Sequence, residues 1–103
     1  MKNKFFKIGN NYIGEGKKVF IIAEIGVNHE GNFKKCVSLF EHAKFSGADA
    51  VKLQTVDIEK NYAKGTDSYN EFKNTDFTNE EFYKLSLIAK KLGLSFFTTP
   101  GDF

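Results

Sequence analysis

The feature of this 103-residue chain that most constrains its fold is the alternation of short apolar runs with amphipathic helical patterns. Three runs are rich in β-branched or aromatic residues and are bounded by glycine or polar clusters, which is typical of β-strands. They cover residues 18–25, 50–56 and 94–99. Strands that alternate with helices in this way form parallel sheets, because each parallel crossover needs a long connection. The pattern therefore predicts an α/β protein.

Two segments between the predicted strands have the spacing and the end signals of helices. In the first, apolar residues recur at intervals of three and four, Asn32 is a candidate N-cap, and Gly47 is a candidate C-terminal residue. The second has a capping box from Thr78 to Glu81 and ends at Gly93. The apolar residues of the first helix are Phe33, Cys36, Val37, Phe40 and Ala43.

The remaining residues complete the predicted element order. Residues 1–17 contain two short apolar runs on either side of an Asn-Asn pair, which predicts a small hairpin. Residues 18–103 then read as β-α-β-loop-α-β. The loop of this series, residues 57–77, is polar and has no sustained periodicity. Because it is too long for an idle connection in a compact α/β unit, we expect it to be functional.

Two architectures share this element order, namely an open doubly wound sheet and the opening portion of an eightfold β/α barrel. A dinucleotide-binding sheet needs a G-x-G-x-x-G turn after its first strand, and the chain has EIGVNHEGN there instead. The sequence also lacks a G-x-x-x-x-G-K-[ST] phosphate loop. The known nucleotide-binding fingerprints are therefore missing.

Composition argues against several classes of protein. The longest aliphatic stretch, residues 19–23, is far shorter than the roughly 20 apolar residues of a membrane span. The N-terminus lacks the apolar region of a secretory signal, so we expect a cytoplasmic location and no membrane partner. All 15 basic residues are Lys, and without Arg forks we expect no nucleic-acid partner. The single cysteine, Cys36, is expected to be core packing.

Polar side chains on the predicted strands are the candidate site. Because side chains alternate between faces, Lys52 and Gln54 share one face while their aliphatic neighbours take the helix-covered face. Together with Glu24 and with Thr98 or Thr99, they are expected in the C-terminal halves of their strands, where barrel enzymes build their sites. An ammonium, hydroxyls, an amide and a carboxylate suit a small anionic substrate. The structural alternative is a buried ion pair between Glu24 and Lys52.

The two histidines are expected to have different roles. His29 lies in the loop after the first strand, where it either braces the loop through hydrogen bonds or contacts substrate. His42 lies off the apolar stripe of the first helix and is expected to be a partly exposed surface residue. Neither has a metal-ligand spacing with another His, Cys or carboxylate, so we expect no metal ligand in this chain.

Three runs in order, IIAEIGVNHEGN, SGADAVKLQT and FFTTP, resemble the N-terminal part of the sialic acid synthase family, which includes N-acetylneuraminate synthase and its pseudaminic and legionaminic acid relatives. The resemblance implies a (β/α)8 barrel capped by an N-terminal hairpin. It also implies condensation of phosphoenolpyruvate with a 2-acetamido sugar such as N-acetylmannosamine, with release of phosphate. The implied cofactor is a divalent metal, manganese or magnesium, and the implied assembly is a homodimer.

By the same resemblance, Glu24 is a catalytic carboxylate that helps with proton transfer or cation stabilisation. Lys52 contacts the phosphoenolpyruvate anion, Gln54 the sugar, and Thr99 joins the phosphate site. One residue departs from the family pattern, because Gly101 stands where Phe commonly follows the Thr-Pro pair.

The chain is much shorter than a complete barrel, and this bears on its possible functions. A (β/α)8 barrel takes about 250 residues, so we expect this chain to be a fragment that carries part of the site, is inactive alone and self-associates through its open sheet. The alternatives are a non-catalytic module that binds a phosphosugar or other anion or pairs with another chain, and an inactive truncated product.

Overall fold

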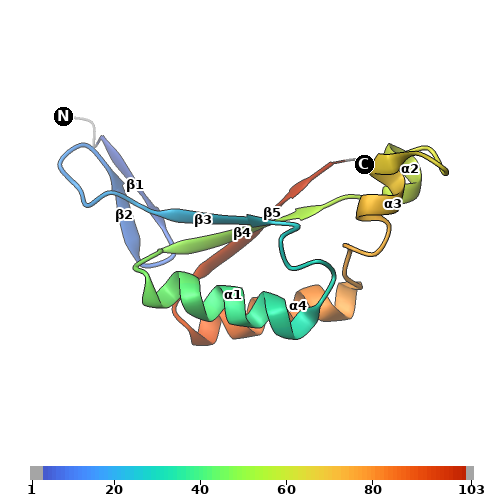
Figure 1. Cartoon of the computed structure of the whole chain (residues 1–103). Helices are drawn as coiled ribbons and strands as arrows, with labels where there is room; N and C mark the ends of the chain where they lie inside the picture. The colour runs from blue at the N-terminus through green and yellow to red at the C-terminus, as the bar shows by residue number, and fades with distance from the viewer. Residues whose placement is uncertain (1–3, 102–103) are drawn as a thin grey trace.

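The computed structural model describes residues 4–101 as a mixed α/β fold (Figure 1). The first two strands form an antiparallel hairpin, and the other three form a parallel sheet in the order β3-β4-β5. The strands are β1 (Phe5–Ile8), β2 (Asn11–Gly14), β3 (Ile22–Gly26), β4 (Ala50–Thr55) and β5 (Ser95–Pro100). The helices are α1 (Phe33–Phe45), α2 (Ile58–Asn61), α3 (Asp67–Phe72) and α4 (Asn79–Lys91).

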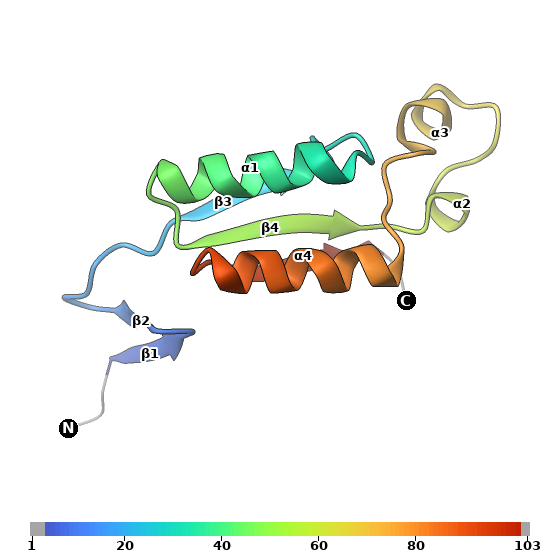
Figure 2. The same ribbon diagram turned by 90° about the horizontal axis from the view of Figure 1, so that it is seen from below.

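The two long helices, α1 and α4, lie side by side on the same face of the parallel sheet (Figures 1 and 2). The core fills the space between them and that face, and it includes Val51 and Leu53 of β4, both fully buried. Cys36 of α1 belongs to this core, and burial raises the pKa of its thiol to about 12. The prediction that Cys36 is core packing is therefore confirmed.

Both long helices begin and end where the sequence predicts. The side chain of Asn32 accepts the backbone N–H of Lys35 at 3.0 Å, which satisfies one free donor of the first turn of α1. Thr78 and Glu81 form the expected capping box of α4. Gly93 follows α4 with φ of +75°, a left-handed conformation that residues with a Cβ rarely adopt. These signals are local, so the sequence alone could locate them.

The first strand of the parallel sheet begins later than predicted, at Ile22 rather than at residue 18. Its partner strand starts only at Ala50, which pairs with Ile22, so the preceding residues extend past the start of β4. At that point the backbone N–H of Ile21 donates to the carboxylate of Asp49 at 2.8 Å instead of to a strand. Val19 is 75% exposed. A strand needs a hydrogen-bonded neighbour, and the first residues of the apolar run lie beyond the start of β4, so they are not part of β3.

The two ends of the sheet carry different additions (Figure 1). The hairpin, present as expected, lies at the end where the parallel strands start, and a Cβ added at Gly9 in its turn would lie 3.0 Å from Ser95 Oγ. Segment 57–77 lies at the opposite end, beyond the carboxyl end of β4. It contains α2 and α3, which the sequence analysis missed because helices of four and six residues are too short to show a period.

Candidate active site

The centre of the uncovered sheet face holds an ion pair between neighbouring strands. Glu24 of β3 and Lys52 of β4 are in register, and Lys52 Nζ donates to Glu24 Oε2 at 2.5 Å. The Lys52 side chain is 21% exposed and that of Glu24 is 51% exposed. Both lie on the face opposite α1 and α4, as alternation predicted. Because about half of the Glu24 side chain is exposed, the pair is accessible to a small molecule.

Gln54 and Thr99 lie one step further along the same face. They are register partners on β4 and β5, and both are exposed. Thr98 points to the other face, because it pairs with the buried Leu53 and its hydroxyl shares a hydrogen bond of 2.7 Å with that of Thr55. Of the two threonines that the sequence left open, Thr99 is therefore the one beside Gln54.

A glycine brings Glu24 and Gln54 together. The ladder between β3 and β4 shifts register between Glu24 and Gly26, and Gly26 has φ of +59°. A Cβ built at Gly26 would lie 3.5 Å from Glu24 Oε1 and 3.9 Å from Gln54 Cδ. The irregularity thus leaves space that these two polar side chains share, on the rim of the uncovered face.

One positional expectation was wrong. Lys52 is the third of the six residues of β4, so it lies in the first half of its strand and not in the C-terminal half. Gln54 and Thr99 are the fifth of six residues in their strands. The four polar side chains therefore occupy two levels, with the ion pair deeper along the sheet and the amide and hydroxyl nearer the rim.

His29 makes the contacts expected of a residue that braces its loop. The residue is 1% exposed, its Nδ1 accepts the backbone N–H of Gly31 at 2.9 Å, and the centroid of its ring lies 4.3 Å from that of Phe77. Burial, followed by the charge of Lys35, lowers its pKa. The neutral ring thus joins the loop after β3 to the start of α4. His42 is exposed, as predicted.

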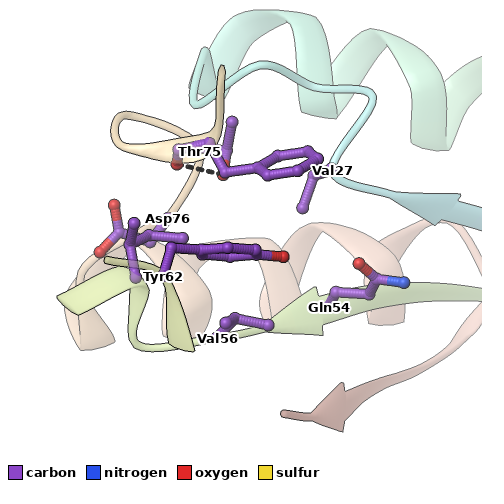
Figure 3. Close-up of a pocket in the computed structure, with 8 residues that line it drawn as sticks. Val27, Gln54, Val56, Tyr62, Thr75 and Asp76 are labelled. Atoms are coloured by element: carbon purple, nitrogen blue, oxygen red, sulfur yellow. Dashed lines mark hydrogen bonds between the residues drawn. The ribbon is translucent and has the colours of Figure 1, made fainter. Parts of the chain in front are cut away.

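Beside Gln54 the structure contains a pocket that the sequence analysis did not find (Figure 3). Its walls come from the loop after β3, from the end of β4 and from segment 57–77. The only sequence signal was the unexplained length of that segment. The lining residues are Val27, Gln54, Val56, Ile58, Tyr62, Phe72, Thr75 and Asp76.

Among residues 4–101, no group of three or more His, Cys, Asp or Glu side chains is placed to hold a metal ion. The carboxylate of Glu24 is engaged by Lys52 instead. Residues 4–101 thus contain no cluster of this kind for the divalent metal that the family resemblance implies. Across the same residues, the helices are all too short or too polar to cross a membrane.

The fold and the arrangement of the strands are similar to those of a solved enzyme. The crystal structure of N-acetylneuraminic acid (sialic acid) synthetase from Leptospira borgpetersenii serovar Hardjo-bovis superposes with a TM-score of 0.87 and 33% sequence identity. The match covers 95% of this chain and 34% of that chain.

Curated sequences give the same relationship. An uncharacterized protein of Methanocaldococcus jannaschii is 43% identical over 96 residues, which are 93% of this chain and 28% of that protein. The N,N'-diacetyllegionaminic acid synthase of Legionella pneumophila is 37% identical over 103 residues, covering 86% of this chain and 29% of the synthase. The chain thus spans less than a third of the length of these two relatives.

The fold and these relatives make the chain similar to part of the sialic-type acid synthases. The sequence model of the NeuB family matches residues 39–103, which include β4, segment 57–77, α4 and β5. The chain belongs to the NeuB family.

Proposed function

We propose that this chain supplies part of the active site of an enzyme that condenses phosphoenolpyruvate with a 2-acetamido sugar to give a nonulosonic acid and phosphate. The observation that carries the proposal is the Glu24–Lys52 ion pair, flanked by Gln54 and Thr99 on the uncovered face of a NeuB-family sheet. The sequential strand order, with α1 and α4 on one face, supports assigning the chain to the first three strands of an eightfold barrel.

In the proposed site, Lys52 and Thr99 bind the phosphoenolpyruvate anion. Lys52 supplies a compact positive charge and Thr99 a hydroxyl donor, and both are suited to phosphate or carboxylate oxygens. They lie on adjacent strands at successive levels of the same face, so one small anion can bridge them. When that anion takes up the ammonium, the carboxylate of Glu24 is released toward the reacting carbons.

Glu24 has the catalytic role in this proposal. A new carbon–carbon bond joins the methylene carbon of phosphoenolpyruvate to the sugar carbonyl carbon, the carbonyl oxygen takes a proton, and positive charge develops at the enol carbon. Water then adds at that carbon and phosphate leaves. A carboxylate beside the reacting atoms can stabilise the developing charge or move the proton. Gln54, next to Glu24 at Gly26, would orient the sugar.

The rest of the proposed setting follows from the reaction. The substrates are phosphoenolpyruvate and an amino sugar similar to N-acetylmannosamine, and we place the reaction in the cytoplasm, where phosphoenolpyruvate is made. A divalent metal, manganese or magnesium, is part of the proposal, and we expect its ligands to lie outside this chain. The active assembly proposed is a homodimer of the native polypeptide.

The test is acceptor-dependent phosphate release by the native polypeptide that carries this sequence. With phosphoenolpyruvate, N-acetylmannosamine and manganese, we expect release that stops when either substrate is omitted. Glu24→Gln keeps the size of the side chain but cannot exchange a proton, so we expect kcat to fall by about 100-fold or more. Unchanged turnover in this variant would remove Glu24 from the mechanism.

The same experiment separates the alternatives. Saturable binding of phosphoenolpyruvate without phosphate release, with sugar and metal present, would show a non-catalytic anion-binding module. If the polypeptide shows neither binding of phosphoenolpyruvate nor release of phosphate, the result would favour an inactive product.

A further inference from the structure

The carboxyl end of the β4–β5 ladder carries two of the proposed site residues. Gln54 pairs with Thr99, and only the pair of Thr55 and Pro100 follows before the ladder ends. Among residues 4–101, β5 pairs with β4 alone. The last hydrogen bonds of such a ladder open most easily, because they have no further pair beyond them. The position of the Thr99 hydroxyl therefore depends on how firmly this end is closed.

Two hydrogen bonds to Thr55 close this end of the ladder. On the helix-covered face, the hydroxyls of Thr55 and Thr98 share a hydrogen bond of 2.7 Å between the two strands. In the backbone, the N–H of Gly101 donates to the carbonyl oxygen of Thr55 at 2.8 Å. A Cβ added at Gly101 would lie 2.8 Å from Val56 Cγ2, so glycine allows this close approach. Thr55 is thus held by two residues that lie on either side of Thr99 in the chain.

The pair of hydroxyls is not needed to fill the core. Thr55 and Thr98 are half-buried on the same face as the fully buried Leu53, where two valines would occupy the same volume. A hydrogen bond between neutral groups adds little net stability, because both groups give up water to form it. What the bond fixes is a distance. The two oxygens lie 2.7 Å apart, whereas methyl carbons pack at about 3.5–4.0 Å. The pair therefore holds the strands roughly 1 Å closer here than apolar side chains would.

The geometry gives the two adjacent threonines of β5 different tasks on opposite faces of the sheet. We propose that Thr98 is a positioning residue, which holds the hydroxyl of Thr99 at the anion site through its own hydrogen bond to Thr55. Because the two threonines share one peptide bond, a shift of Thr98 on the helix-covered face moves Thr99 on the other face. This inference rests on the proposed function, which gives Thr99 its contact with the phosphoenolpyruvate anion.

The experiment measures the dissociation constant of phosphoenolpyruvate for the native polypeptide by isothermal titration calorimetry. Thr98→Val should raise this constant about 10-fold, because a misplacement near 1 Å weakens a positioned contact strongly. Thr98→Ser keeps the hydroxyl and should leave the constant nearly unchanged. Thr99→Val removes the contact itself and should raise the constant by about 10- to 150-fold. Because Thr98 acts through Thr99, the Thr98→Val/Thr99→Val double variant should bind no more weakly than Thr99→Val alone.

A second double variant separates positioning from stability. Thr98→Val alone leaves the hydroxyl of Thr55 without this partner and should lower the Tm, whereas Thr55→Val/Thr98→Val leaves no hydroxyl to satisfy and should recover it. The affinity for phosphoenolpyruvate should not recover, because two methyl groups keep the strands further apart. This variant also decides the matter if Thr98→Val fails to fold. Ser86→Ala is the matched control, since it removes a hydroxyl that donates to the Tyr83 carbonyl at 2.6 Å on α4, and the dissociation constant should not change.

The outcomes distinguish this inference from the proposed function. If Thr99→Val weakens binding but Thr98→Val does not, or if affinity recovers together with the Tm in Thr55→Val/Thr98→Val, the positioning role is overturned and the anion site stands. Fully additive effects of Thr98→Val and Thr99→Val would overturn it as well. An unchanged dissociation constant in Thr99→Val would refute the anion site and this inference together. The expected affinities without any phosphate release would refute the proposed reaction while supporting the positioning role.

Discussion

Replacing Lys52 by Met gives a quantitative test of the anion site. Met keeps much of the length of the side chain and removes its charge. Hydrogen bonds to a charged group contribute about 1.5–3 kcal/mol, which corresponds to an increase of about 10- to 150-fold in the KM for phosphoenolpyruvate. The effect on stability should be small, because Glu24 is 51% exposed and can be hydrated when its partner is lost. Such a pair contributes at most about 1 kcal/mol.

The control is Glu24→Gln, which breaks the same ion pair but keeps the ammonium. Steady-state kinetics on the native polypeptide should show a raised KM for phosphoenolpyruvate in Lys52→Met alone, and a lowered kcat in Glu24→Gln. Thermal unfolding should show similar, small changes in Tm for both. An unchanged KM in Lys52→Met, or an equal rise in both variants, would mean that Lys52 only holds Glu24 in place, and the anion-site reasoning would be refuted.

Three further predictions concern the fold. Phe40→Ala empties a fully buried site and should cost about 3–5 kcal/mol of unfolding free energy in urea titrations, whereas Phe45→Ala, at a side chain 94% exposed, should change it by less than about 0.5 kcal/mol. Burial lowers the pKa of His29 from 6.5, so the unfolded chain binds a proton at this histidine more readily than the folded chain does. The contribution of His29 to stability should therefore be full above pH 6.5 and fall as the pH drops toward the folded pKa, and His29→Gln should remove this pH dependence. A urea midpoint that rises on acidification would contradict this prediction. The isolated 103-residue chain should self-associate, since Ile22 and Phe97 are 46% and 40% exposed on the open sheet face, and a compact monomer in sedimentation velocity would count against it.

Much of the fold could be predicted because its signals are local. The caps at Asn32 and Thr78 satisfy backbone donors within their own helices, so the same residues that signal the helix also begin it. Alternation placed Lys52 and Gln54 opposite the core, because β4 keeps a regular pleat between two neighbours. Those parts needed no knowledge of distant contacts.

The parts that the sequence could not predict depend on tertiary contacts. The start of β3 at Ile22 is set by where β4 begins, and the choice of Thr99 over Thr98 is set by the register of β5. The pocket needs Val27 and Phe72 to meet from segments far apart in the chain. Its one early sign was that segment 57–77 was long without a period, which indicated function but not geometry.

The central claim is that the side chains around Glu24 serve a reaction that joins the carbons of phosphoenolpyruvate to an amino sugar. The most direct measurement is the mass spectrum of the products that the native polypeptide forms from uniformly carbon-labelled phosphoenolpyruvate, unlabelled N-acetylmannosamine and manganese. We expect an acid that contains the sugar together with every labelled carbon, formed about 100-fold or more slowly by the Glu24→Gln variant. Label recovered only in phosphoenolpyruvate or pyruvate, with the sugar unchanged, would contradict it.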